Sequence, residues 1–140
     1  MKLLIINGPN LGNIGRREPE IYGHENFDSK LESLRKEFSG YEINYYQSHH
    51  EGEIVAKLHN AELEKYDGII LNAGAYSHTS YSIRDAVAAI SVPVVMVHIS
   101  NVYARENFRH ENVIAANCKG VITGFGLKSY ELAVSSFATE

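Results

Sequence analysis

The chain has 140 residues, which fits one compact domain, so we expect residues 1–140 to form a single domain. Hydrophobic residues make up 44% and charged residues 21%, values that argue against a disordered or fibrous chain. The 13 Lys and Arg against 17 Asp and Glu give a net charge of −4, which argues against binding nucleic acid through a broad basic surface. A small anion held in a local pocket remains compatible with that charge.

The sequence carries no signal of a membrane or secreted protein. No apolar run reaches the roughly 20 residues of a membrane span, and the N-terminal stretch MKLLIING is too short for a signal peptide. The single cysteine, Cys118, excludes an intrachain disulfide and a zinc site built from cysteines. We therefore expect a cytoplasmic protein with no membrane partner.

Short apolar segments alternate with amphipathic segments along the chain. Residues 2–7 are apolar at consecutive positions, as in a strand covered on both faces, and residues 28–38 place leucines at helical spacing. By the same criteria we expect further strands at 41–47, 68–72, 93–100 and 119–124, and further helices at 51–65, 79–90 and 127–138. Ser48 and Glu51 form a capping-box pattern before the second helix. This order predicts an α/β, flavodoxin-like fold: a five-stranded parallel sheet with helices on both faces.

Polar side chains concentrate at the predicted carboxyl ends of the strands, where ligands bind in folds of this kind. The segments concerned are 7–23, 47–52, 72–80 and 98–110. Five of the seven histidines fall in them, namely His49, His50, His78, His98 and His110. Loops are often polar without any function. The richness of these loops in His, Asn and Arg nevertheless favours a convergent polar site.

The first of these segments is long for a connection between a strand and a helix, as lids and binding loops are. Its glycines follow neither the G-x-G-x-x-G dinucleotide pattern nor a P-loop, so a nucleotide site is only weakly supported. Arg17 near Tyr22 would lower the pKa of the phenol, and such a tyrosine can act as a general base. Surface pairing of Arg17 with Glu18 or Glu20 fits the spacing equally well.

Metal and nucleophile patterns are poorly supported. His49 and His50 are adjacent and cannot easily face one ion, so we expect no metal site. A triad of Ser100, His98 and Asp85 can be written down, but no Gly-x-Ser-x-Gly elbow accompanies it.

His98 ends a predicted buried strand, where a catalytic group is held rigidly. On its own it is more simply a core histidine bonded to the backbone. Asn72 and His78 follow the preceding strand and are expected to approach the same cleft. Asp85 lies one to two turns into the next helix and could instead pair with Arg84 at the surface.

Arg105 and Arg109 are four residues apart and share a face of a short helical turn. Two guanidinium groups placed in this way can hold a carboxylate through paired hydrogen bonds. The alternative is a solvated cluster in which both arginines pair with Glu106.

These polar segments closely resemble those of the type II 3-dehydroquinate dehydratases. The matching stretches run in collinear order over essentially the whole chain: NGPNLGNIGRREPEIYG at 7–23, QSHHEG at 47–52, NAGAYSHTSYSIRDA at 72–86, VHISNVYARENFRH at 97–110 and KGVITGFGLKSYELA at 119–133. The resemblance implies a single catalytic domain that removes water from a small anion, 3-dehydroquinate, in the shikimate pathway toward chorismate and the aromatic amino acids. It also implies no metal, no organic cofactor, and a homo-oligomer that is typically a dodecamer built from trimers.

The resemblance further implies a role for each matching residue. Tyr22 would take a proton from the carbon next to the ketone, and Arg17 would keep Tyr22 ionised. His98 would be the acid that protonates the leaving hydroxyl. Asn10 would hold a water against the enolate oxygen, and Asn72 would orient His98 and bind substrate. The other positions would bind substrate or close over it: His78, Asp85 and Arg109 at hydroxyls and carboxylate, the Ile99 backbone and Ser100 at the carboxylate, and Arg17, Tyr22 and Arg105 in a lid.

Four positions depart from the usual pattern of that family. His49 replaces an asparagine, Tyr103 stands at a common histidine, and Glu111 at a common second histidine. Met96 stands where a glutamate often precedes the acid by two residues. Because Met96 and His98 point to the same face of one strand, this departure puts in doubt any carboxylate support for His98.

Two other classes of protein remain open at this point. A flavodoxin-like module that binds FMN or a nucleotide would be expected to carry a phosphate loop, which this sequence lacks. A catalytically silent relative kept for assembly would not need the set of Tyr22, Arg17 and His98, which is intact here.

Overall fold

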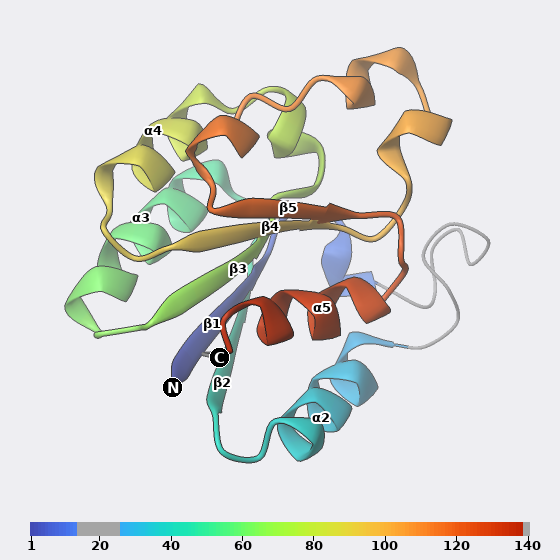
Figure 1. Ribbon diagram of the computed structural model, residues 1–140. Coiled ribbons are helices and arrows are strands. Elements are labelled where there is room, and N and C mark those ends of the chain that lie inside the picture. The colour runs from blue at the N-terminus through green and yellow to red at the C-terminus, as the bar shows by residue number, and fades with distance from the viewer. Residues whose placement is uncertain (14–25, 139–140) are drawn as a thin grey trace.

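The computed structural model describes residues 1–13 and 26–138. The described residues form a five-stranded sheet in the order β2-β1-β3-β4-β5, and every neighbouring pair is parallel (Figure 1). The strands are β1 (Lys2–Asn7), β2 (Glu42–Gln47), β3 (Gly68–Asn72), β4 (Val94–His98) and β5 (Gly120–Thr123). All five predicted strands and the flavodoxin-like arrangement are confirmed.

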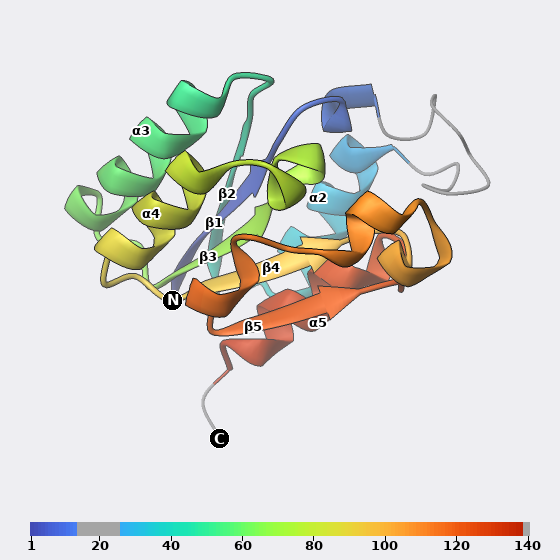
Figure 2. The same ribbon diagram turned by 90° about the horizontal axis from the view of Figure 1, so that it is seen from above.

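Helices cover both faces of this sheet, as predicted. They are α2 (Phe27–Glu37), α3 (Glu51–Leu63), α4 (Tyr81–Ala89) and α5 (Lys128–Ser136). Helices α3 and α4 lie on one face, and α2 and α5 lie on the other (Figures 1 and 2). Short 3-10 turns complete the connections: η1 (Leu11–Asn13), η2 (Gly74–His78), η3 (Val102–Ala104), η4 (Asn107–His110) and η5 (Ala115–Asn117). No helix among the described residues is long and apolar enough to pass through a membrane.

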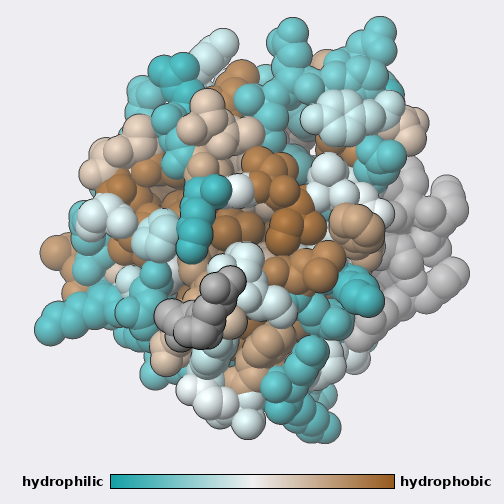
Figure 3. Space-filling view, viewed as in Figure 1, coloured by the Kyte–Doolittle hydropathy of each residue, from teal (hydrophilic) through white to brown (hydrophobic). Residues whose placement is uncertain are grey.

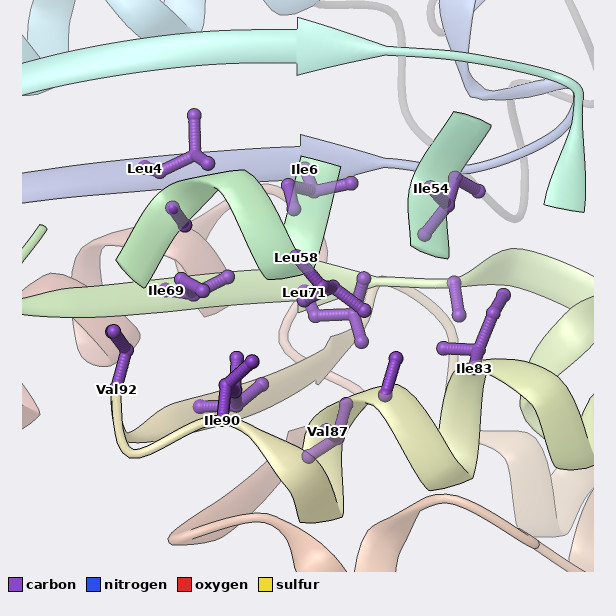
Figure 4. Packing of buried hydrophobic residues seen from close by; sticks show 14 of the residues in the cluster. Leu4, Ile6, Ile54, Leu58, Ile69, Leu71, Ile83, Val87, Ile90 and Val92 are labelled. Carbon is purple, nitrogen blue, oxygen red and sulfur yellow. The ribbon is translucent and has the colours of Figure 1, made fainter. Parts of the chain in front are cut away.

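The three central strands are buried on both faces, because helices pack above and below them. Every residue of β3 and β4 is buried, and so is β1 from its second residue onward. Alternate side chains of a strand face opposite sides of a sheet, so Leu4 and Ile6 pack toward α3 and α4 while Leu3 and Ile5 join the other cluster. Figure 4 shows the first of these clusters, with Leu58 of α3 seated against Leu71 of β3.

The edge strand β5 is more open than the central ones. Val121 on β5 is 45% exposed, and Leu132 on the neighbouring helix α5 is 36% exposed. Figure 3 shows hydrophobic side chains gathered over this part of the molecule. An uncovered apolar edge of this kind is a surface that another chain can cover.

The predicted capping box at the start of α3 is wrong. The helix begins two residues later than that pattern requires, so its N-cap is His50, which makes no side-chain capping bond. Ser48 instead accepts from the His50 backbone N–H at 2.9 Å and donates to the Glu53 carboxylate at 2.7 Å. The Glu51 carboxylate accepts a hydrogen bond from Ser80, which is the N-cap of α4. The two helices on this face are therefore tied together at their N-termini.

The core on the α3 face predicts a large loss of stability on truncation. We expect Leu58→Ala, at a fully buried position, to lower the free energy of unfolding by about 2–5 kcal/mol, because it leaves a cavity. Leu63 lies on the same helix but is 80% exposed, so Leu63→Ala should change stability by less than about 0.5 kcal/mol. Urea unfolding of both variants measures the difference. Equal losses would contradict this packing.

Candidate active site

A polar pocket lies at the carboxyl ends of β1, β3 and β4. Strands β1 and β3 are neighbours from which the chain winds in opposite directions, and such a switch point opens a crevice between the connections. The pocket is lined by three groups of residues: Pro9, Asn10 and Leu11 after β1; Asn72, Gly74, Ala75 and His78 after β3; and His98, Ile99, Ser100, Val102, Arg105 and Arg109 from β4 onward. Three of the four predicted polar segments therefore meet there.

The fourth predicted segment, after β2, supports the pocket from outside rather than lining it. The Gln47 amide donates to the Gly8 carbonyl at 3.1 Å. His49 accepts from the Asn10 backbone N–H through Nδ1, also at 3.1 Å. Asn10 adopts a left-handed backbone with φ of 66°, which asparagine tolerates better than most residues. His49 thus stabilises the turn that presents Asn10, which gives this departure from the family pattern a structural role.

A buried tyrosine joins the ends of two neighbouring central strands, β1 and β3. The Tyr130 hydroxyl of α5 donates to Asn7 Oδ1 at 2.7 Å and accepts from Asn72 Nδ2 at 2.9 Å. Burial raises the pKa of Tyr130 above its usual range, so the hydroxyl keeps its proton. Asn72 Oδ1 accepts from the Gly74 N–H at 3.2 Å. In these bonds the Asn72 amide contacts Tyr130 and Gly74, and its role in orienting His98 stays a prediction.

His98, the last residue of β4, is buried and neutral. Burial, together with the neighbouring His78 and Arg109, lowers its pKa to about 4. The His78 ring lies parallel to it with centroids 6.1 Å apart. The amide of Asn112 contacts its Nε2 at 3.1 Å. His98 is therefore not a core histidine bonded to the backbone, the simpler alternative, but a desolvated imidazole facing a polar pocket.

His78 is fixed by a backbone carbonyl. Its Nδ1 lies 2.6 Å from the Glu111 oxygen, and since a carbonyl only accepts, Nδ1 carries the proton in this bond. Phe108 packs edge-on against the same ring, with centroids 5.9 Å apart. The Glu111 side chain takes no part in this bond, so this departure from the family pattern leaves the carbonyl contact in place.

The two predicted arginines both line the pocket and both contact Glu106. Arg109 Nε lies 2.9 Å from one carboxylate oxygen, and Arg105 Nε lies 3.9 Å from the other. The hydrogen bond from Arg109 lowers the pKa of Glu106. Arg105 also donates to Ser100 Oγ at 3.4 Å. The contacts with Glu106 that the sequence allowed are thus present, while a role of the two arginines in holding a carboxylate stays a prediction.

Asp85 lies apart from the other predicted residues. Its side chain is 70% exposed and pairs with Arg84 at 3.2 Å, the alternative that the sequence also allowed. The cause is helical spacing, because Ile83, Ala86 and Val87 of α4 face the sheet and turn Asp85 outward. Its role in substrate binding stays a prediction. Arg17 and Tyr22, the other members of the predicted set, lie outside the described residues.

Sequence reasoning missed two residues that hold the site in place, Tyr130 and Asn112. Tyr130 lies on a helix whose spacing indicates only core packing, and its partners are more than 50 residues away in sequence. Asn112 follows the arginine-rich segment, where its polarity alone gives no signal. Within residues 1–13 and 26–138, no three His, Cys, Asp or Glu side chains are grouped as metal ligands.

Known proteins share this architecture over the whole chain. A 3-dehydroquinate dehydratase of an Exiguobacterium species is 55% identical over 139 residues, covering 96% of this chain and 92% of that protein. Another, from Caldicellulosiruptor bescii, is 51% identical and covers 95% and 93%. The crystal structure of a type II dehydroquinase from Butyrivibrio crossotus matches with a TM-score of 0.95 at 45% identity, covering 99% and 98%.

The sequence pattern of the family described as dehydroquinase class II matches residues 1–138. The fold and the pocket thus define an α/β protein with its site at the carboxyl ends of a parallel sheet. The chain belongs to the dehydroquinase class II family, which confirms the resemblance seen in its motifs.

The hydrogen bonds of the Tyr130 hydroxyl predict a measurable loss of stability when the hydroxyl is removed. Tyr130→Phe leaves Asn7 Oδ1 and Asn72 Nδ2 buried without this partner, so we expect the free energy of unfolding to fall by about 1–3 kcal/mol. Tyr41→Phe is the matched control, because no hydrogen bond to the Tyr41 hydroxyl occurs within the described parts of the chain, and its loss should stay below about 0.5 kcal/mol. Urea unfolding tests both; equal stability of the two variants would contradict the network.

The pKa of His98 predicts a pH dependence of stability. The pKa of His98 is about 4 in the folded chain and about 6.5 in the unfolded chain. Near pH 5, His98 is therefore protonated in the unfolded chain but neutral in the folded chain. This contribution is complete above pH 6.5 and is lost as the pH falls toward 4. We expect wild type to lose up to about 3 kcal/mol more than His98→Gln between pH 7 and pH 4, measured by urea unfolding. Parallel declines would show that His98 titrates normally.

Proposed function

We propose that this chain is a hydro-lyase that dehydrates 3-dehydroquinate to 3-dehydroshikimate through an enolate, as a type II dehydroquinase. The observation that carries the proposal is the pocket itself, where a desolvated histidine, two arginines and two asparagines converge at the carboxyl ends of three parallel strands. Relatives about 50% identical over the full chain are named for this activity, and that agreement supports the same substrate here.

The positive end of the pocket fits the carboxylate of the substrate. Arg105 and Arg109 both line the pocket, and the Glu106 carboxylate that contacts them is itself exposed to solvent. The Ser100 hydroxyl and the Ile99 backbone line the same end. An anion bound there gains charge-assisted hydrogen bonds in a partly desolvated site. This local field explains how a chain of net charge −4 can bind an anion.

His98 is proposed as the acid, and substrate binding would favour its protonated form. In the free pocket its pKa is about 4, chiefly because the ring is buried and in smaller part because His78 and Arg109 are close. A bound carboxylate offsets the arginine charge, which acts to raise the pKa of His98 and favours uptake of a proton from solvent. The imidazolium then gives this proton to the leaving hydroxyl as the carbon–oxygen bond breaks, and water departs.

Tyr22 is proposed as the base, with Arg17 lowering its pKa. The tyrosinate removes a proton from the carbon next to the ketone, and the electron pair moves into an enolate. When the carbon–oxygen bond breaks, that pair forms the new carbon–carbon double bond. The proton held by Tyr22 then returns to solvent, so each turnover converts one substrate into one product and one water. Asn10 would hold a water against the enolate oxygen, where charge develops.

Other elements of the proposal rest on the resemblance and on the shape of the molecule. His78, Asn72 and Asp85 would bind substrate hydroxyls, and Arg105 would belong to a lid that closes with Arg17 and Tyr22. The apolar edge at β5 supports assembly into a homo-oligomer, for which the resemblance suggests a dodecamer of trimers. The family further suggests a cytoplasmic enzyme of the shikimate pathway that needs no metal or organic cofactor.

The test follows the ultraviolet absorbance of the conjugated enone product after 3-dehydroquinate is added. We expect absorbance to rise, and Tyr22→Phe and His98→Gln each to lower kcat by a factor of about 100 to 10,000, because each removes one proton-transfer group. Circular dichroism confirms that the variants are folded. A variant that keeps the wild-type rate would refute its residue's role. Folded wild-type protein that yields no enone would refute the proposed activity and point to a binding module.

A further inference from the structure

The histidine at the centre of the pocket has an uncharged neighbour on its own strand. Met96, two residues before His98 on β4, is fully buried and offers only a thioether sulfur. The Asn112 amide lies against both residues. Its Nδ2 is 2.9 Å from Met96 Sδ and 3.1 Å from His98 Nε2. One NH₂ group with two hydrogens therefore faces two acceptor positions.

The backbone fixes which end of the Asn112 amide faces His98. Its Oδ1 accepts from the N–H groups of Ile114 and Ala115, both at 3.0 Å, in the turn that leads into η5. A backbone N–H can only donate, so the oxygen end must point at the turn and the NH₂ end at the histidine. The contact between Asn112 and His98 is therefore an N–H···N hydrogen bond in which His98 Nε2 accepts.

We propose that Asn112 is the positioning residue of His98, holding the ring neutral in the free protein with Nε2 bare and the proton on Nδ1. Its importance for turnover rests on the proposed dehydratase function, but the protonation state does not. A ring nitrogen that accepts a hydrogen bond cannot carry a proton, and the amide contact fixes the ring plane as well. An imidazolium would set two donors, Nε2–H and the amide N–H, against each other.

The surroundings of His98 favour the same neutral state. Charged and titratable groups face it from each neighbouring element: His78 from η2, Tyr103 from η3, Arg105 beyond η3, and Arg109 and His110 from η4. No Asp or Glu is among the described residues that line the two cavities on either side of the ring. A carboxylate would stabilise the imidazolium, whereas a donated hydrogen bond and nearby cations oppose it. Asn112 thus makes the protonated His98 a stronger acid.

The first test is nitrogen-15 NMR of the histidine rings in the substrate-free protein, assigned with His98→Gln. Ring nitrogen shifts distinguish the two neutral tautomers. We expect His98 to remain neutral with its proton on Nδ1 from pH 8 down to about pH 5. A proton on Nε2, or a charged ring at pH 6, would overturn the proposal. This measurement needs no substrate, so it stands or falls independently of the dehydratase activity.

Two substitutions separate positioning from turn capping. Asn112→Ser keeps a short oxygen that can accept from the turn but removes the donor to His98. Asn112→Asp keeps the capping oxygen and places a carboxylate beside Nε2. We expect Asn112→Asp to raise the pKa of His98 by between about 1 and 3 units and to move the proton to Nε2. Asn112→Ser should raise the pKa less and give a mixture of tautomers.

The second test measures how kcat depends on pH. Activity that needs a protonated His98 declines as the pH rises through its pKa in the complex, so a higher pKa moves this basic limb upward. We expect Asn112→Asp to shift the basic limb upward by the same number of pH units as it raises the pKa of His98 measured by NMR. Met96→Leu is the matched control, because it removes only the sulfur acceptor, and it should leave both limb and tautomer unchanged. The proposal would be overturned if the Asn112 variants changed neither the tautomer of His98 nor the basic limb of the pH profile.

Discussion

The hydrogen bonds of the Tyr130 hydroxyl to Asn7 and Asn72 hold together the carboxyl ends of two neighbouring central strands, β1 and β3. Asn7 ends β1 and Asn72 ends β3, and the chain leaves these neighbours toward opposite faces of the sheet. Buried amides at such a junction are costly unless satisfied, and one hydroxyl acts as donor to the first and acceptor from the second. The position of every pocket group that follows these strands depends on this junction.

Electrostatics in the pocket follow from burial as much as from charge. Glu106 contacts Arg105 and Arg109, yet it is more exposed than either arginine, so solvent screens the anion more than the cations. His98 lies deeper and remains neutral chiefly because it is desolvated, with His78 and Arg109 acting in the same direction. These contacts are consistent with the proposed binding of an anion beside the residue proposed to act on it.

The departures from the family pattern are accommodated by local contacts rather than by a changed fold. His49 supports the turn at Asn10, and the carbonyl of Glu111 fixes His78 whatever side chain the residue carries. Met96 is matched by Asn112, whose amide fills the space between the thioether and the imidazole. The uncharged pair of Met96 and Asn112 gives His98 a distinct electrostatic setting on an otherwise shared scaffold.

The sequence by itself determined the strands, the helices and the edge of the sheet at which the site lies. Apolar runs such as 2–7 can be satisfied only between two covering layers, and parallel strands bring their following loops to one edge. The family motifs likewise placed His98, Asn10 and the arginines in one site. Only the tertiary structure decided the side-chain partners. Tyr130 is more than 50 residues from each asparagine it binds, and helical phase turned Asp85 outward although its motif placed it in the site. Hydrogen-bond partners depend on distances of a few tenths of an ångström between distant segments, and no local pattern of residues specifies these.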